Sequence, residues 1–443
     1  MRRTRGMRLA ALTGIGALAL TSCLSQSDSG GTSSGGGGGS DAGDGVVEVF
    51  GAFTGSEQDS FEATVAPFEQ ESGIDIKYTG NADFATLIRS NVQSGNPPDI
   101  GVFPQPGLLL DIADSGDIVP IEDYLDTASL EETLVPGLLD SVTDSEGTIF
   151  GSPMKLAVKS LVWVPKDAWE QGGYQVPETF SELLALSEQI KADGIAPWCL
   201  GMEAAAATGW YGTDWVEEMV LRTAGPDVYD QWVSHEIPFN DPAIQTAFDT
   251  YGEILFGEGF VLGGTEGVLN TNVEDADNPQ FEDPPGCMMQ RQGNFVVDFY
   301  PTDVQKNLDD SVTVFAMPPV EGGFDGKSVL GGGDLVSLFN GDDQEAIDVA
   351  TFLTSPEFGV EWAQTGSFLS PHTTFDTSNY PNETVKSIAE IVGSADVFRF
   401  DGSDLMPAEV GVGTFWTGMV EWTSGDKTTE EVTTDIENSW PSS

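Results

Sequence analysis

The chain has 443 residues, and its 72 acidic against 17 basic residues give a formal net charge of −55. A body this acidic repels nucleic acid and anionic lipid, which excludes a nucleic-acid partner and electrostatic binding to a membrane. Hydrophobic residues make up 39% of the chain and aromatic residues 10%, so we expect a folded protein, long enough for two domains.

The first 45 residues have the order of a secretory signal followed by a flexible segment. Four arginines within the first eight residues precede an apolar run at 9–20, which is too short to span a bilayer comfortably. The end of that run, Leu20-Thr21-Ser22-Cys23, resembles the bacterial lipobox, which implies that Cys23 is the lipidated N-terminus of the mature chain. An ordinary secretory signal with an incidental cysteine is the alternative. Residues 24–45, rich in glycine and serine, would then be a tether with a reach of about 25 Å.

Strands and helices alternate after the tether. Strands are predicted at 46–50, 74–78 and 100–103, and helices at 59–72 and 84–94. On the first helix Phe61, Val65 and Phe68 recur with the helical period. This alternation is typical of a parallel sheet with helices on both faces, in which ligands bind at the carboxyl ends of the strands. Those ends are predicted at 53–57 and 104–107.

The pattern restarts near residue 158, where a strand carrying Trp163 is predicted at 158–164. Thr179 and Glu182 have the spacing of a capping box, which marks the start of another helix. A short strand at 198–201, a helix at 208–222 and a late helix at 346–353 follow. The restart indicates a second α/β lobe that is entered through an extended crossover.

Two cysteines remain beyond Cys23. Cys199 and Cys287 form an even pair in a compartment that we expect to be oxidising, so a disulfide is predicted, with a buried pair of free thiols as the alternative. The only histidines are His235 and His372, which argues against a zinc site built on histidine. We expect no metal site and no cofactor.

The acidic residues are scattered along the whole chain, without an EF-hand spacing or a Gly-Asp repeat. They could form a calcium-binding surface, a solvated surface suited to a saline or alkaline habitat, or an electrostatic trap for a cationic substrate. The even scatter favours the solvated surface.

Several segments resemble the extracellular solute-binding proteins of sugar importers. They are the opening strand and turn at 47–55, the segment Gly95-Asn-Pro-Pro-Asp-Ile-Gly-Val102, the segment Gly331-Gly-Gly-Asp-Leu-Val336 and the helical residues 346–366. A narrower resemblance to the branch that binds α-glucosides lies at 197–201, 206–210, 213–215 and 284–287. The resemblance spans nearly all of the chain after Gly45.

The resemblance implies an α/β, two-lobed periplasmic-binding-protein-like fold. Each lobe would be a mostly parallel sheet flanked by helices, and a multi-strand hinge would join the lobes. The expected divisions are a lipoprotein signal peptide at 1–22, a Gly/Ser-rich tether at 23–45, lobe 1 at 46–157, lobe 2 at 158–315, a return to lobe 1 at 316–371, and a C-terminal helical part, mainly in lobe 2, at 372–443.

The resemblance also implies the function. The protein would be a monomeric receptor, lipid-anchored at the extracellular face of the cell membrane. It would bind an α-glucoside or short oligosaccharide between its lobes and deliver it to the permease subunits of an ABC importer. The alternatives are a secreted glycoside hydrolase and a passive surface adhesin. The sequence holds no Gly-x-Ser-x-Gly elbow and no His-Glu-x-x-His motif, so we expect no enzyme.

A sugar ring needs a flat aromatic partner for its C–H face and several polar groups for its hydroxyls. The candidate aromatic residues are Trp163, Trp210, Tyr211 and Trp416. Trp210 is preferred because it follows Ala-Thr-Gly in a loop that opens a helix. The candidate polar residues are Ser56, Glu57, Gln105, Lys155, Asp214, Arg291 and Asp334. The alternatives are core packing for the aromatic residues, helix capping for Ser56 and Glu57, and a solvated surface position for Lys155 and Arg291.

Replacement of Cys23 by alanine tests the anchor. Cys23→Ala removes the thiol that would carry lipid, so we expect the protein to be shed into the medium or retained unprocessed. Cell fractionation and intact mass measure both. Unchanged membrane fractionation of the variant, together with a wild-type mass that shows no acyl group, would contradict lipidation.

Overall fold

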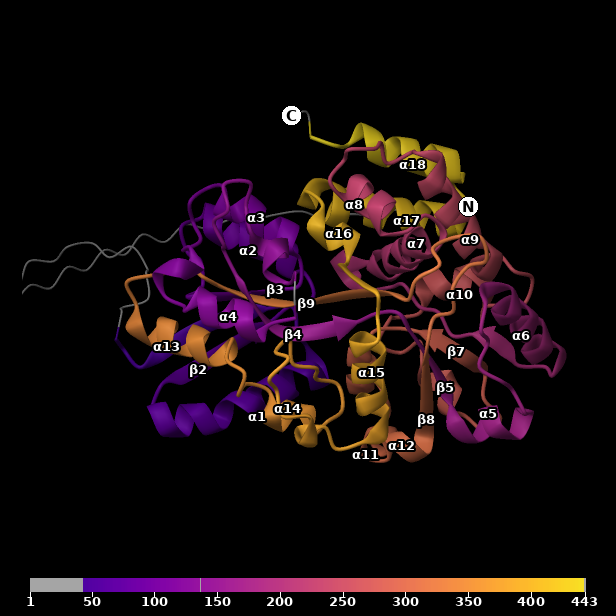
Figure 1. Cartoon of the computed structure of the whole chain (residues 1–443), viewed down its shortest axis with the longest axis horizontal. Coiled ribbons are helices and arrows are strands. Elements are labelled where there is room, and N and C mark those ends of the chain that lie inside the picture. Colours follow the sequence, from indigo (N-terminus) through magenta and orange to yellow (C-terminus); the bar gives the residue numbers. More distant parts are fainter. Residues whose placement is uncertain (1–42, 136, 442–443) are drawn as a thin grey trace, which may run out of the picture. The chain divides into compact units, whose positions relative to one another are not determined.

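The computed structural model describes residues 43–135 and 137–441, in which two β-sheets are covered by helices (Figure 1). The expected signal peptide, Cys23 and nearly all of the tether lie outside these residues. Among the helices described, none is both long enough and apolar enough to cross a bilayer.

The first sheet has the strand order β10-β9-β3-β1-β2. The strand β4 also pairs with β9, along residues 331–336. Its strands are β1 (Val46–Gly51), β2 (Asp75–Gly80), β3 (Ile100–Phe103), β4 (Ser152–Val158), β9 (Ser328–Leu338) and β10 (Val397–Phe400). The pairs β1–β2, β1–β3 and β9–β10 are parallel, whereas β9 runs antiparallel to β3 and β4. The predicted strand–helix alternation is therefore confirmed at the start of the chain.

Helices connect and cover this sheet. Those between the first three strands and after them are α1 (Gly55–Ser72), α2 (Phe84–Gln93) and α3 (Pro106–Ala113). The others that follow are α4 (Thr127–Thr133), α13 (Gln344–Leu353), α14 (Val360–Ala363) and α16 (Gly402–Leu405). Three more helices, α11 (Thr302–Lys306), α12 (Leu308–Ser311) and α15 (Glu383–Gly393), pack together beside β8 of the second sheet. The chain thus returns to the first sheet after residue 316, through β9 and β10.

The second sheet has the order β6-β7-β5-β8. Its strands are β5 (Leu161–Pro165), β6 (Ala196–Trp198), β7 (Cys287–Arg291) and β8 (Val312–Ala316). Only β6 and β7 are parallel, and β5 is antiparallel to both of its neighbours. The expected fold class is right, but a mostly parallel second sheet is not found. The reason is that periodicity identifies strands, while strand direction depends on how each connection crosses the sheet.

The second sheet is surrounded by another set of helices. They are α5 (Lys166–Gly172), α6 (Phe180–Ala192), α7 (Trp210–Thr223), α8 (Pro226–Val233), α9 (Pro242–Leu255), α10 (Gly264–Asn270), α17 (Trp416–Ser424) and α18 (Thr429–Asn438). The hydroxyl of Thr179 caps α6 by accepting from the backbone N–H of Glu182. The carboxylate of Glu182 accepts from the N–H of Glu178 instead, so half of the predicted capping box forms.

The described residues form two hydrophobic cores, one on each sheet, and Leu161 and Trp163 of β5 also pack into the core of the first sheet. Phe61, Val102 and Leu335 lie in the core of the first sheet, and Trp215 and Trp232 lie in that of the second. The C-terminal segment is divided between them: the buried residues up to Ala408 belong to the first core, except Met406, and those from Val410 onward belong to the second.

Cys199 and Cys287 form the expected disulfide, between the end of β6 and the start of β7. The bond therefore joins two neighbouring strands within the second sheet.

The two sheets are joined most directly by Lys159 and Ser160, which lie between β4 and β5. This link is held against β9, because the N–H of Lys159 donates to the carbonyl of Leu330 and the N–H of Leu330 donates to the hydroxyl of Ser160. β4 and β9 run side by side into the link (Figure 1). A two-residue connection leaves little freedom, so the position of one sheet on the other is set close to Lys159.

Asp277 is a buried carboxyl group near the second sheet. The side chain has no exposed surface, and neither of its oxygens has a hydrogen-bond partner among the described residues. Burial raises the pKa of Asp277 to about 7. In the unfolded chain the group ionises near pH 4, so the stability that its neutral form contributes is lost as the pH rises from about 4 through 7.

Asp277→Asn isolates this effect, since the amide stays neutral at every pH. We expect the free energy of unfolding of the variant, relative to wild type, to rise between pH 5 and pH 8 by about 2–3 kcal/mol. Chemical denaturation at each pH measures the difference. The control is Asp117→Asn, at an exposed aspartate, which should show no such trend. A pH-independent difference for Asp277→Asn would show that the carboxyl group ionises normally.

Candidate ligand-binding cavity

An open cavity of about 890 Å³ lies between elements of the two cores. This volume is in the range of small-molecule sites. The residues that line it from the side of the first sheet follow β1, β2 and β3 or lie on β4 and β9, while others come from α7 and from the segment before β8. A ligand in the cavity would therefore contact both halves of the structure.

The edge of the first sheet supplies one wall of the cavity. Phe53, Glu57 and Gln105 line it, at the starts of α1 and α3. Parallel strands bring their carboxyl ends to one edge, and this edge was predicted from the sequence at 53–57 and 104–107. The side-chain oxygen of Gln105 is buried and has no partner among the described residues, so it is available to a ligand hydroxyl.

Lys155 lies on β4 with 1% of its surface exposed. Its ammonium forms an ion pair with Glu57 and lies 4.5 Å from the ring centroid of Trp362. Asp334 is opposite Lys155 in the β4–β9 ladder. Burial raises the pKa of Asp334 to about 7, although Lys155 opposes this shift. Lys155, Glu57 and Asp334 thus form a buried polar group that faces the cavity.

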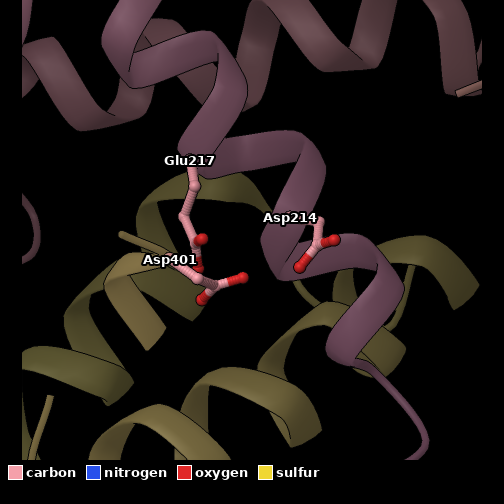
Figure 2. Close-up of side chains that lie close together, drawn as sticks. All are labelled: Asp214, Glu217 and Asp401. Atoms are coloured by element: carbon pink, nitrogen blue, oxygen red, sulfur yellow. The ribbon is translucent and has the colours of Figure 1, made fainter. Parts of the chain in front are cut away.

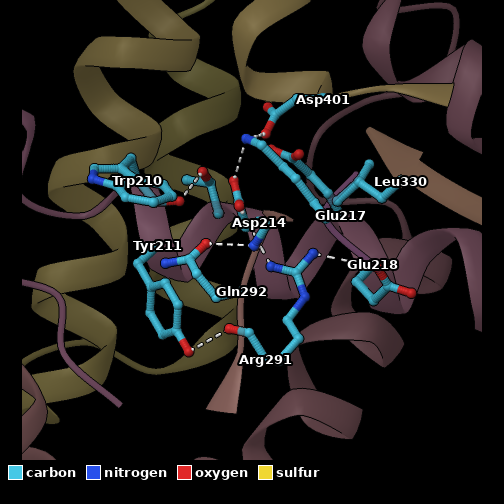
Figure 3. A network of polar contacts seen from close by, with 12 residues as sticks. Trp210, Tyr211, Asp214, Glu217, Glu218, Arg291, Gln292, Leu330 and Asp401 are labelled. Atoms are coloured by element: carbon cyan, nitrogen blue, oxygen red, sulfur yellow. Dashed lines mark hydrogen bonds and ion pairs between the residues drawn. The ribbon is translucent and has the colours of Figure 1, made fainter. Parts of the chain in front are cut away.

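Lys159 forms a second polar group, at the link between the sheets. Its ammonium lies 3.0 Å from Asp214 Oδ1 on α7 and 2.5 Å from Asp401 Oδ2, directly after β10. Asp214 is also 3.4 Å from Arg291 (Figure 3). The ammonium of Lys159 lies 5.7 Å from the ring centroid of Trp210. One buried cation therefore joins the second-core helix α7 to the end of a strand of the first sheet.

Three carboxyl groups crowd around this cation. Asp214 and Glu217 extend from α7 toward Asp401 (Figure 2), and ligand-type oxygens of the three lie within 4.8 Å of one another. Glu217 accepts from the backbone N–H groups of Gly402 and Ser403 at 3.1 and 2.9 Å. Such a trio has the donor set for a hard cation, but Lys159 already serves as the cation for two of its members.

Burial decides the protonation of the trio. It raises the pKa of Glu217 well above its usual range and that of Asp214 to about 7, with Asp401 adding to both shifts. Burial also disfavours ionised Asp401, but Lys159 and hydrogen bonds from its neighbours outweigh that and hold the pKa of Asp401 below its usual range. Lys159 therefore favours the ionised form of Asp401, while burial favours the neutral form of Glu217.

Aromatic residues form the opposite wall. Trp210, Trp416, Phe295 and Phe299 line the cavity, and the rings of Trp210 and Phe295 are 6.2 Å apart. Gly209, with φ of 119°, precedes Trp210, and a Cβ at this glycine would lie 2.2 Å from the carbonyl oxygen of Trp416. Only glycine permits this approach, so Trp210 and Trp416 are held close to each other.

Seven of the residues selected from the sequence line the cavity: Glu57, Gln105, Lys155, Trp210, Asp214, Asp334 and Trp416. The structure brings them together from the starts of α1 and α3, the strands β4 and β9, the helix α7 and the C-terminal segment. Their role in binding remains a proposal.

The other four do not line the cavity. Trp163 has no exposed surface, belongs to the core of the first sheet and donates its indole N–H to the carbonyl of Gln292. The hydroxyl of Tyr211 donates to the carbonyl of Arg291 at 2.8 Å. In this conformation neither ring has a free face for a sugar, because both are packed on all sides.

Ser56 and Arg291 also make protein contacts. The hydroxyl of Ser56 donates to the carbonyl of Asp298 at 2.6 Å. Arg291 has no exposed surface and lies between Asp214 and Glu218, where it balances their charge. The alternative of a solvated surface position for Arg291 is therefore wrong, since two buried carboxylates hold it.

Sequence reasoning missed several lining residues, including Lys159, Asp401, Phe295 and Phe299. The scarcity of lysine that drew attention to Lys155 applies equally to Lys159. Asp401 follows a strand at its carboxyl end, which is the position where ligands are expected. Phe295 and Phe299 carry no comparable signal, because they lie in a short 3₁₀ segment without periodicity.

Comparison with known proteins identifies the class. Residues 54–359 match the family described as bacterial extracellular solute-binding proteins, and the chain belongs to this family. Members of this class are extracellular or periplasmic components of ABC importers.

Two relatives match most of the chain. The osmoprotective compounds-binding protein GgtB of Synechocystis sp. is 42% identical over 395 residues, which cover 89% of this chain and 92% of the relative. The alpha-glucosides-binding periplasmic protein AglE of Rhizobium meliloti is 36% identical over 400 residues, which cover 89% and 86%. The narrower branch suggested by the sequence is therefore among its relatives.

Solved structures share the fold. The bacterial solute receptor AcbH, described as preferring β-D-galactopyranose, superposes with a TM-score of 0.76 at 18% identity and covers 90% of this chain and 97% of its own. The GacH receptor of Streptomyces glaucescens, solved without ligand and with acarbose, gives a TM-score of 0.67 at 16% identity and covers 89% and 96%. At these identities the likeness concerns the fold alone.

Lys159→Met tests the buried ion group. The change removes the cation that balances Asp214 and Asp401, and breaking a buried pair in this way costs about 3–5 kcal/mol. Without Lys159 the pKa of Asp401 should rise, so the variant takes up a proton on folding and its deficit should shrink as the pH falls from 8 to 5.

Denaturant unfolding at several pH values measures the deficit. The matched control is Lys77→Met, which removes an exposed lysine 3.6 Å from Asp75 and should cost less than about 1 kcal/mol at every pH. If Lys159→Met is as stable as this control, the ion pairs of Lys159 with Asp214 and Asp401 do not stabilise the fold.

Proposed function

We propose that the protein is a membrane-tethered extracellular receptor that binds an α-glucoside or a short oligosaccharide between two lobes and delivers it to an ABC importer. The observation that carries the proposal is the cavity of about 890 Å³, which is lined by aromatic rings, carboxyl groups and amides from both halves of the structure. Membership of the solute-binding family gives this cavity its context.

The relatives support the α-glucoside. GgtB is named for osmoprotective compounds and AglE for alpha-glucosides, and this chain aligns with both over 89% of its length. Both are binding proteins rather than enzymes, which favours a receptor over a hydrolase. An α-glucoside that serves as an osmoprotectant fits both names.

The geometry suggests how a sugar is held. The C–H face of a pyranose ring packs on Trp210, while hydroxyl groups donate to the carboxylates of Glu57 and Asp334 and to the amide oxygen of Gln105. Trp210 lies in the second half and the other three lie in the first. A ligand that contacts both halves favours the closed arrangement, because only differential affinity shifts the equilibrium between open and closed forms.

The proposed architecture keeps the divisions expected from the sequence, with lobe 1 at 46–157 and 316–371 and lobe 2 at 158–315. The C-terminal part at 372–443 would be shared, since its buried side chains are divided between the cores near Ala408. Lipid on Cys23 and the tether at 23–45 would hold the receptor, as a monomer, near its permease.

Isothermal titration calorimetry with methyl α-D-glucoside, maltose, trehalose and sucrose tests the proposed function. We expect one-to-one binding of at least one of these ligands without its hydrolysis, and a smaller radius of gyration in the complex by small-angle X-ray scattering. If no saccharide binds at millimolar concentration, the receptor hypothesis fails.

Trp210→Ala removes the proposed stacking partner. We expect the bound saccharide to lose about 1–3 kcal/mol of affinity, the scale of a buried aromatic contact, while Trp210→Phe retains most of it. Trp210 is only partly buried, so its removal should lower the melting temperature less than Trp163→Ala, which removes a core ring. Normal binding by Trp210→Ala would show that the ligand stacks elsewhere.

A further inference from the structure

The cavity contains more carboxyl groups than cations. Nine of its lining residues are acidic and three are basic. The acidic residues are Glu57, Asp83, Glu203, Asp214, Glu274, Asp334, Asp401, Asp404 and Glu409. Because the whole chain is acidic, this number alone decides nothing. What matters is whether any cation in the cavity is free to receive an anionic ligand.

No basic residue of the lining is free. Arg89 lies 2.7 Å from Asp111, Lys155 is paired with Glu57, and Lys159 is paired with two aspartates. Lys155 and Lys159 are buried and already in contact with their partners, so neither can turn toward a ligand without abandoning a buried carboxylate. A ligand carboxylate or phosphate would therefore have to displace a carboxylate partner, which is buried or nearly so at Lys155 and Lys159 and partly exposed at Arg89.

Helix N-termini are the remaining source of positive potential. α1, α2 and α3 all begin at the cavity, and exposed N–H groups at such ends commonly bind anions. At α1 and α2, however, the protein places its own carboxyl groups there: Glu57 in the first turn of α1 and Asp83 before the first turn of α2. These carboxyl groups lie at the positive ends of α1 and α2, where an anionic ligand would bind. The start of α3 has no carboxyl group, but its first residue is Pro106, which has no N–H to donate.

Other carboxyl groups face the cavity without an ion pair. Among the described residues, Asp334 and Asp404 form no salt bridge and accept no hydrogen bond with their side chains. Burial raises the pKa of Asp404 well above its usual range, with Asp401 adding to the shift. The contribution of Asp401 depends on the sign of charge, because the negative field that disfavours ionised Asp404 also disfavours a ligand anion placed beside it.

We propose that the cavity selects saccharides by the sign of their charge, excluding anionic ones such as uronates and sugar phosphates and accepting neutral or ammonium-bearing ones. This selection rests on the proposed function. It concerns which glucosides bind, whereas the proposed function concerns whether any glucoside binds. The paired lysines and the carboxyl groups at the helix starts are its physical basis.

Three ligands of one shape test the selection. Methyl α-D-glucopyranoside, its 6-carboxylate (methyl α-D-glucuronide) and its 6-amino-6-deoxy analogue differ only in carrying a hydroxyl, an anionic or a cationic group at carbon 6. Calorimetry and competition at pH 7.5 give the three dissociation constants. We expect the carboxylate to bind at least 100-fold more weakly than the ammonium analogue, and the hydroxyl parent to lie between them or close to the ammonium analogue.

The comparison of the two charged analogues separates charge sign from the cost of desolvating any charge. A difference of less than tenfold between them, or tighter binding of the carboxylate, overturns the selection while binding of the parent leaves the receptor function intact. If none of the three binds, the proposed function fails for this glucoside and the selection falls with it.

A variant locates the effect. Asp334→Asn removes one cavity carboxyl group with little change in shape and should reduce the ratio between the charged analogues at least threefold. Asp117→Asn removes a carboxyl group outside the lining and should leave the ratio unchanged. If the ratio of the two dissociation constants is the same in both variants and in wild type, the assignment of charge selection to the cavity carboxyl groups is overturned. If Asp334→Asn does not fold, the wild-type ratio still tests the selection.

Discussion

The buried ammonium group of Lys159 is the interaction on which the arrangement of this protein depends. It lies in the two-residue link between β4 and β5 and contacts Asp214 of the second half and Asp401 of the first. A buried charge is tolerated only with partners in good geometry. The lysine therefore constrains the link, the start of α7 and the end of β10 at one point, and that point lines the cavity.

The same constraint explains the chemistry of the cavity wall. Four buried carboxyl groups, those of Asp214, Glu217, Glu218 and Asp401, lie near three buried cations: Lys159, Arg291 and Arg222, which pairs with Glu218 on the same helix. Burial raises the pKa of Glu217 and that of Asp404, which favours their neutral forms and reduces the negative charge to be balanced. The result is a rigid polar surface that offers hydroxyl groups both acceptors and donors, as recognition of an uncharged saccharide requires.

The family relationship and the cavity support each other at different levels. Relatives at 42% and 36% identity assign the class of the chain, whereas solved structures near 18% identity share only its fold. Within that class, the residues of this chain decide what is bound. The close approach of Gly209 to the backbone of Trp416 brings Trp210 near Trp416, and both line the cavity together with Glu57 and Asp83 at the starts of α1 and α2.

By itself, the sequence determined what depends on neighbours along the chain. The period of Phe61 and Val65, the cap at Thr179 and the strand ends at 53–57 and 104–107 follow from local geometry. The tertiary structure alone decided the direction of β7 and β8, since strand direction depends on distant connections. It also decided which polar residues face the cavity. In the sequence, Arg291 and Asp214 are both isolated charged residues, yet only Asp214 lines the cavity. The difference arises because folding brings distant segments together and so decides which side chains are buried.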